Sequence, residues 1–181
     1  FFQAEDGIRA SSTSRGLGDV YKRQVYRSDQ ALTFTTANSE RLKITSSGGF
    51  QFSNGLFDEK CNITAGKLSD NTNIDVGDAN IWYFSTTETT TSTPNIRWDS
   101  TYSLASKVLR GEAITVTIIT TAAAAGYSAQ LNIDGAGQTE QWNGGSAPSA
   151  GGSDGYDVYT HTIYRKEDGN YLVLSNVSNF T

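Results

Sequence analysis

Apolar and polar residues alternate along most of the chain after its first thirty residues, and this alternation predicts strands. The stretches ALTFTT, ERLKIT and GFQF are separated by the turn-forming stretches ANS and SSGG. In ERLKIT, Leu42 and Ile44 fall on one face and Arg41 and Lys43 on the other, because successive side chains of a strand point to opposite sides. Residues 25–56 therefore predict a meander that ends a short β-rich stem.

The strongest strand pattern begins at residue 80. Seven short alternating stretches are bounded by turn-forming residues: NIWYFSTT, NIRWDS, EAITVTIITT, YSAQLNID, QTEQW, YDVYTHTIYRK and NYLVLSNV. Regularly spaced short strands of this kind are typical of a β-sandwich. We therefore predict an all-β fold in which residues 80–181 form an antiparallel, jelly-roll-like sandwich. The expected core residues are Ile114, Val116, Ile118, Leu131, Ile163, Leu172 and Leu174.

Between these regions, residues 57–79 are polar and rich in turn formers, which predicts a connector or a run of short edge strands. The stretch DNTNIDVGD invites comparison with a calcium-binding loop, because its Asn and Asp residues alternate as loop ligands do. The register argues against calcium: Gly77 lies one place late for the sharp turn, and Trp82 stands where a bidentate Glu should close the loop. We expect a solvated turn and no metal.

Composition narrows the classes of function. The hydrophobic fraction of 36% is low and Gly is abundant, which favours a turn-rich β protein over a helical one. The net charge is -5 and no basic cluster follows residue 24, so we expect no nucleic-acid partner. Cys61 is the only cysteine, which excludes an intrachain disulfide. No apolar run approaches the roughly 18 residues of a spanning helix, so we expect no membrane insertion.

The first 24 residues, FFQAEDGIRASSTSRGLGDVYKRQ, differ from everything that follows. They show neither a period of 2 nor one of 3.6, and they lack the apolar core of a secretory signal. QAEDGIR and SRGLGDVYKRQ resemble the translation of a sequencing adaptor fused to the edge of a metagenomic contig. We expect residues 1–24 to be non-native and disordered, and the remainder to be the C-terminal end of something longer. The alternative is a disordered basic arm.

Residues suited to catalysis are few and scattered. His161 is the only histidine, and its strand neighbours predict that it faces solvent or a subunit neighbour. A pair of Cys61 and His161 lacks a third group to orient the imidazole. We therefore expect no enzyme activity and no cofactor, although a carboxylate pair that meets only in the fold stays open. The carboxylates considered are Asp99, Glu112, Asp134 and Glu140.

The stretch EQWNGGSAPSAGGSDGYDVY holds a long loop between two strands, flanked by aromatic residues. Loops of this length in a compact domain are usually functional or disordered. Trp142 and Tyr156 offer flat apolar faces on which sugar rings can stack. The equally weighted alternative is that Trp142 caps the core. The candidate receptor-contact residues are Trp142, Asn143, Ser146, Ser149, Ser153, Asp154 and Tyr156.

Two sets of motifs carry a family resemblance. ERLKITSSGGFQF resembles the ERMRITSSGNVGIG-type repeat of phage tail fibres and spikes, although GFQFSNG replaces the usual VGIG ending. YFSTTETTTSTPNIRW, AITVTIITTAAAAGYSAQLNIDG, QWNGGSAPSAGGSDGYDVYTHTI and the final NVSNF resemble the C-terminal domain of tail-fibre and structural proteins of marine tailed phages. No catalytic residue accompanies these motifs.

The resemblance implies a virion structural protein, the tip of a fibre or spike that contacts the host surface or only ends the fibre. It implies a homotrimer with other virion proteins and a host cell-surface glycan as partners. Three-fold packing of the stem would bury Leu42 and Ile44 against their copies and leave the loop outside. A secreted bacterial adhesin or carbohydrate-binding module is the alternative, and a polysaccharide depolymerase spike is the third candidate.

Deleting residues 1–24 should leave the thermal unfolding midpoint of the protein unchanged, because that segment has no period, no caps and no apolar face to pack. Differential scanning calorimetry of the full chain and of residues 25–181 measures this. A loss of several degrees in the truncated protein would contradict the adaptor interpretation.

Overall fold

The computed structural model describes residues 31–54 and 56–181 and divides into two compact units after Asp58. Strands and three short 3-10 helices make up the regular structure of this part of the chain, which contains no α-helix. The prediction of an all-β fold is therefore confirmed. Over the same residues, no helix has the length and apolar character needed to cross a membrane. The adaptor-like residues 1–24 lie outside the described residues.

The first unit contains a three-stranded antiparallel sheet in the order β1-β2-β3. Its strands are β1 (Leu32–Thr36), β2 (Ser39–Ile44) and β3 (Phe50–Phe52), where the alternating pattern places them. The turn between β1 and β2 consists of Ala37 and Asn38, whose φ angles are 50° and 58°. Two residues with positive φ make a type I′ turn, whose twist matches that of a hairpin.

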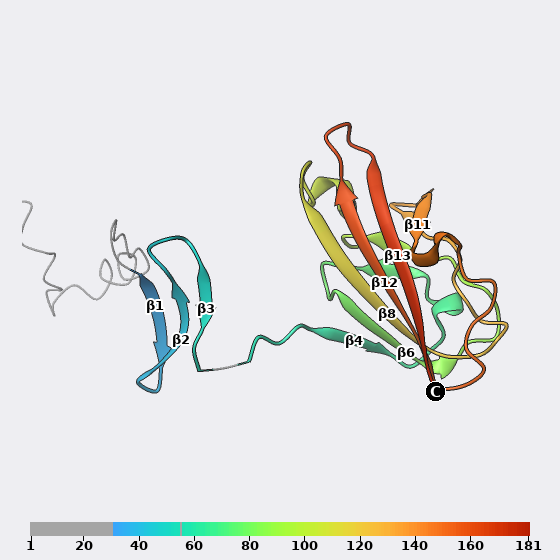
Figure 1. The fold of residues 1–181 in the computed structure, drawn as a ribbon, viewed down its shortest axis with the longest axis horizontal. Coiled ribbons are helices and arrows are strands. Elements are labelled where there is room, and N and C mark those ends of the chain that lie inside the picture. The colour runs from blue at the N-terminus through green and yellow to red at the C-terminus, as the bar shows by residue number, and fades with distance from the viewer. Residues whose placement is uncertain (1–30, 55) are drawn as a thin grey trace, which may run out of the picture. The chain divides into compact units, whose positions relative to one another are not determined.

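The second unit contains a six-stranded and a four-stranded sheet (Figure 1). The larger sheet has the order β11-β13-β12-β8-β6-β4 and the smaller one the order β10-β9-β7-β5. The larger sheet consists of β4 (Cys61–Thr64), β6 (Ile81–Thr87), β8 (Ala113–Thr121), β11 (Glu140–Trp142), β12 (Tyr156–Arg165) and β13 (Tyr171–Phe180). The smaller consists of β5 (Asn73–Asp75), β7 (Asn95–Arg97), β9 (Asn132–Ile133) and β10 (Ala136–Gly137), and the helices are η1 (Leu68–Asp70), η2 (Leu104–Ser106) and η3 (Asn143–Gly145).

The two sheets are mixed, which corrects the expectation of a purely antiparallel sandwich. The chain passes from one sheet to the other at each step from β4 to β9, so β4, β6 and β8 run parallel in one sheet and β5, β7 and β9 run parallel in the other. Alternation of apolar and polar residues shows which face of a strand is buried. The pattern is the same in parallel and antiparallel sheets, so it does not predict the direction of a strand. The segment expected to be a connector or edge strands supplies β4 and β5, the first turn of this winding.

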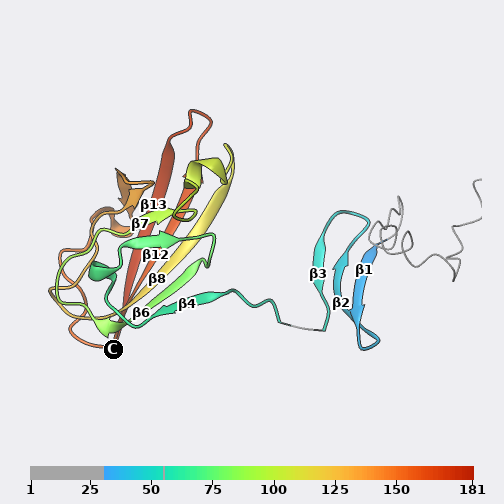
Figure 2. The same ribbon diagram turned by 180° about the vertical axis from the view of Figure 1, so that it is seen from behind.

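The two sheets, drawn from behind in Figure 2, contribute side chains to one hydrophobic core. Ile74, Ile96 and Ile133 stand side by side on β5, β7 and β9, and all three are buried. The larger sheet contributes the buried Trp82, Phe84, Val116, Ile118, Tyr159, Ile163 and Val173 to the same cluster. The three isoleucines come from the stretches TNID, PNIR and LNID.

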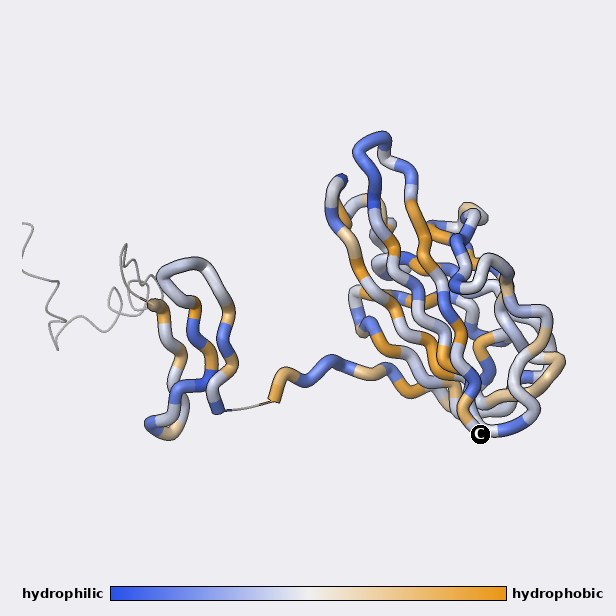
Figure 3. Tube along the Cα trace, in the orientation of Figure 1, coloured by the Kyte–Doolittle hydropathy of each residue, from blue (hydrophilic) through white to orange (hydrophobic). Residues whose placement is uncertain are grey.

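The expected core residues are only partly correct. Val116, Ile118, Leu131 and Ile163 are fully buried, and Ile114 packs against the core while half-buried. Leu172 and Leu174 face outward, with 37% and 48% of their surface exposed, whereas Val173 between them is fully buried. Figure 3 shows consecutive apolar residues in this stretch, and because successive side chains point to opposite faces, its own pattern does not fix the inner face. Pairing with β12 decides it, because Val173 lies opposite the inward-facing Ile163.

Replacing Ile96 by Ala should lower the free energy of unfolding by about 2–5 kcal/mol, since it opens a cavity at the centre of the isoleucine row. Ile63→Ala is the matched control, because Ile63 lies on β4 with 69% of its surface exposed. Urea unfolding of both variants measures the difference. Equal losses would show that the two sheets do not share a core at Ile96.

Candidate functional site

Three adjoining hollows lie on the surface of the second unit, and we call them together the polar groove. The central hollow has a volume of about 470 Å³ and shares Asp134 with a neighbour of about 290 Å³. On its other side it shares Gln138 and Thr139 with a hollow of about 520 Å³. The shared residues make the three hollows one continuous series.

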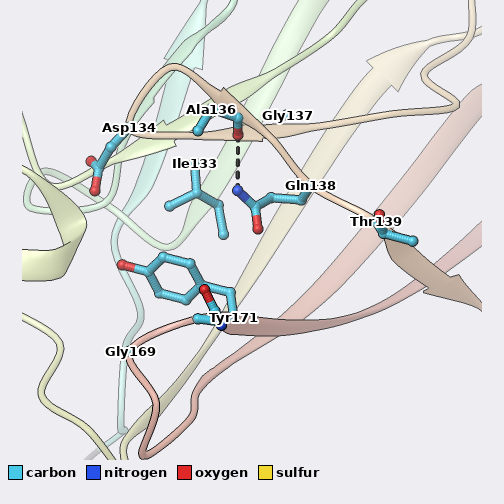
Figure 4. A pocket seen from close by; sticks show the side chains of 9 residues that line it. Ile133, Asp134, Ala136, Gly137, Gln138, Thr139, Gly169 and Tyr171 are labelled. Carbon is cyan, nitrogen blue, oxygen red and sulfur yellow. Dashed lines mark hydrogen bonds between the residues drawn. The ribbon is translucent and has the colours of Figure 1, made fainter.

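A hairpin positions the central hollow. Asp134 and Gly135 join β9 to β10 with φ angles of 51° and 80°, which is the two-residue Asp-Gly turn favoured in hairpins. Beyond the hairpin, the Gln138 side chain donates from Nε2 to the carbonyl oxygen of Ala136 at 2.9 Å. Figure 4 shows Ile133, Gln138 and Tyr171 directed toward one another, with Asp134 at one end and Thr139 at the other.

Each hollow has one aromatic residue in its lining, Tyr102, Tyr171 and Trp142 in turn. The Tyr102 ring lies 4.2 Å from the Lys107 ammonium, and half of its surface is exposed. Tyr171 and Trp142 are half-buried and pack against the core. The core thus holds two of the rings in place, while amide and hydroxyl groups line the same hollows.

The four carboxylates considered as acids or bases all accept hydrogen bonds from backbone N–H groups. Asp134 accepts from Leu104 at 2.7 Å and from Ala105 at 3.2 Å, at the start of η2. Asp99 accepts from residues 101 and 102 at 2.6 and 2.7 Å, and Glu112 accepts from residue 109 at 2.7 Å. Glu140 accepts from the backbone N–H of residue 131, and burial raises the pKa of its carboxyl. Each carboxylate therefore has a structural role in fixing a turn or strand.

The predicted receptor loop does not form one cluster. Trp142 lines the groove, whereas Tyr156 lies on the outer face of the larger sheet, with its ring centre 6.0 Å from that of Tyr83. Asn143 donates to the Asn176 side chain at 3.1 Å. The remaining candidates Ser146, Ser149, Ser153 and Asp154 are exposed and are absent from the linings of these three hollows.

The end of that loop is held firmly in place. The Gly152 N–H donates to both oxygens of the buried Asp157 carboxylate at 3.0 Å, and the Asn179 amide donates to the same carboxylate at 2.5 Å. The backbone N–H of Ala122 donates to Gly155 at 2.9 Å. Trp142 packs against the core, as the second alternative expects, and its side chain also lines one of the hollows.

His161 is buried, so the prediction that it faces solvent or a subunit neighbour is wrong. The inner face of β12 carries Asp157, Tyr159, His161 and Ile163 in alternation. His161 Nδ1 shares a 2.9 Å hydrogen bond with the Ser175 hydroxyl, and the ring stacks on Tyr159. Nε2 is buried without a hydrogen-bond partner among the described residues. Burial lowers the pKa of His161 to about 4.

The positions of the residues also decide the Cys61–His161 pair and the calcium-like stretch. Cys61 is exposed on the edge strand β4, and two strands separate it from β12, so it does not meet His161. Asp75, from the calcium-like stretch, accepts from the Arg97 guanidinium at 2.6 Å. Asn73 lies beside it on β5 and accepts from Asn95 at 2.9 Å. Across residues 31–54 and 56–181, no cluster of three or more His, Cys, Asp or Glu side chains suited to a metal occurs.

No family model, curated protein or solved structure matches the chain. The evidence for a functional site at the groove is therefore its geometry alone. Sequence reasoning missed Tyr102, Gln138 and Tyr171. Gln138 and Tyr171 line the central hollow because the segment after the β9–β10 hairpin lies beside the start of β13, and Tyr102 lines the neighbouring hollow. The Asp-Gly pair in LNIDGAGQ was the available signal, since it predicts the hairpin that positions Gln138.

Stability should fall as the pH decreases from 6.5 to about 4, because the unfolded chain takes up a proton on His161 in this window and the folded protein does not. Above pH 6.5 both states hold a neutral imidazole, and His161 contributes no pH dependence. The expected loss from this group is roughly 3 kcal/mol at the acid end.

Urea unfolding of the wild type and of His161→Gln at a series of pH values measures this contribution. The carboxylates titrate in both proteins, so the difference between the two curves isolates His161. Parallel curves between pH 6.5 and 4.5 would contradict the buried neutral imidazole.

Proposed function

We propose that this chain is the C-terminal tip of a tailed-phage fibre or spike and that it binds a neutral glycan of the host surface in the polar groove. The observation that carries the glycan proposal is the series of three adjoining hollows, each with one aromatic side chain and several amide or hydroxyl groups. A sugar ring presents a C–H face and a rim of hydroxyl groups. An aromatic ring packs against the C–H face, and amide groups form hydrogen bonds with the hydroxyl groups.

The charges around the groove favour a neutral ligand. Its lining includes the carboxylates of Asp99, Asp134 and Glu140. The one cation in the linings of the three hollows is Arg97, and its guanidinium is paired with Asp75 at 2.6 Å. The Lys107 ammonium lies beside them, over the Tyr102 ring, so the carboxylates still outnumber the cations. Like charges repel in a concave site, so uronic acids, sialic acids and phosphorylated glycans would bind poorly.

The assignment to a virion rests on the motif resemblance, and the groove is consistent with it. In this proposal three copies of the chain form one tip, and many weak contacts act together, so avidity replaces the affinity of a single site. A secreted adhesin or carbohydrate-binding module would use the same groove. The genes beside the coding sequence distinguish the two, because virion genes cluster together.

The depolymerase alternative requires a carboxylate pair that exchanges protons with a bound sugar. Asp134 and Glu140 line the groove, but backbone N–H groups already donate to both. We therefore propose binding without cleavage. Incubating the protein with host exopolysaccharide should leave the chain length of the polymer unchanged.

Tyr102→Ala should weaken glycan binding about tenfold, because the variant removes the exposed ring of one hollow. Tyr156→Ala is the matched control: Tyr102 and Tyr156 expose 51% and 46% of their surfaces, but Tyr156 lies outside the groove. A screen of neutral and acidic oligosaccharides identifies the ligand, and calorimetric titration of the variants follows. Binding confined to acidic sugars, or equal weakening by the two substitutions, would refute the proposal.

A further inference from the structure

The Gln138 side chain offers a fixed hydrogen-bond acceptor to the central hollow of the polar groove. Its backbone N–H donates to the carbonyl oxygen of the fully buried Leu131 at 3.0 Å, and its Nε2 donates to that of Ala136 at 2.9 Å. A carbonyl oxygen only accepts, so the amide nitrogen must face Ala136 and Oε1 must face the other way. In the described part of the chain the Gln138 side chain makes this one hydrogen bond, which leaves Oε1 to accept from a ligand.

An apolar wall lies beside this acceptor. Ile133, Ala136 and Tyr171 line the same hollow. Ile133 belongs to the hydrophobic core and the half-buried Tyr171 ring packs against it, so both are held in place. Figure 4 shows the Gln138 oxygen pointing away from Ala136, to the side on which Ile133 and Tyr171 lie. The hollow therefore combines one oriented acceptor with an adjacent apolar surface.

We propose that the central hollow takes the N-acetyl group of an acetamido sugar, an inference that rests on the glycan function proposed above. The planar trans amide of this group carries its N–H and its methyl on one edge and its carbonyl oxygen on the opposite edge. With the first edge in the hollow, the N–H donates to Gln138 Oε1 and the methyl packs against Ile133 and Tyr171. The carbonyl oxygen then faces the open side, where water donates to it.

Other substituents at the same sugar carbon fit this hollow less well. A hydroxyl group leaves the apolar wall in contact with water. An ammonium group loses its hydration against that wall, which is costly for a charge. A carboxylate meets Asp134, the one carboxylate in the lining of this hollow, which already accepts from Leu104 and Ala105 at 2.7 and 3.2 Å. The acetamido group is neutral and has both an N–H donor and a methyl.

Tri-N-acetylchitotriose and cellotriose provide a matched pair of ligands, because they share one linkage and differ only in an acetamido or a hydroxyl group beside the anomeric carbon. Calorimetric titration of the full chain should give about tenfold tighter binding of the acetylated trisaccharide, since one methyl in an apolar site distinguishes ligands by this factor or more. In saturation-transfer NMR, the acetyl methyl protons of the bound ligand should receive the strongest saturation.

Gln138→Met and Thr139→Ala are the matched variants, because both residues line the central hollow. Gln138→Met keeps the length of the side chain and removes the acceptor. The acetamide N–H then loses its partner, whereas the hydroxyl of cellotriose rotates toward water, so the preference should fall to about twofold. Thr139→Ala should keep the tenfold preference. If Gln138 only held the hairpin in place, its loss would weaken both ligands equally and leave their ratio unchanged.

The possible failures of this inference and of the proposed function are distinguishable. Equal affinities of the wild type for the two trisaccharides, or a preference that survives in Gln138→Met, would overturn the acetamido assignment. A neutral glycan without acetamido groups that binds more tightly than chitotriose, with binding weakened by Tyr102→Ala, would overturn it too and leave the proposed function standing. If no oligosaccharide of the screen binds, the proposed function itself fails.

Discussion

The core shared by the two sheets of the second unit is the interaction on which the rest of that unit depends. The smaller sheet has strands of only two or three residues, too short to persist without the larger sheet. Its isoleucine row, Ile74, Ile96 and Ile133, is buried against residues such as Phe84 and Ile118. Because the chain crosses between sheets at each step, every turn of the winding adds one strand to each sheet and one isoleucine to the core.

Carboxylates fix the irregular segments that the hydrophobic core does not hold in place. Glu88 is buried and accepts from the backbone N–H groups of Leu68 and Ser69, at the start of η1. Asp134 does the same for η2, and Asp157 fastens the end of the long loop. Hydrogen bonds from backbone N–H groups to charged acceptors are stronger than neutral ones. A chain with a low apolar fraction thereby holds its irregular segments in place.

This way of building the unit also shapes the groove. Its walls are the β9–β10 hairpin, strand ends and the loops beside them, and hydrogen bonds or core packing fix Asp134, Gln138 and Tyr171. A site formed in advance loses less conformational entropy when it binds a ligand.

The sequence by itself determined the all-β class, the strand positions of β1–β3, and much of the core of β8 and β12. Alternation was sufficient there, because Val116, Ile118 and Ile163 lie in stretches with one apolar face. It was insufficient for β13, where Leu172 and Leu174 are as apolar as Val173. His161 lies two residues before Ile163, so the same alternation places it inward, against the expectation drawn from its polar character.

Strand direction and the groove were decided by the tertiary structure alone. Parallel pairing of β4, β6 and β8 depends on where the connections go, and a local period carries no information about that path. Tyr102, Asp134 and Tyr171 are far apart in the chain and line adjoining hollows only after both sheets have formed. The sequence fixes the side-chain chemistry that is available, and packing decides which of those side chains share one surface.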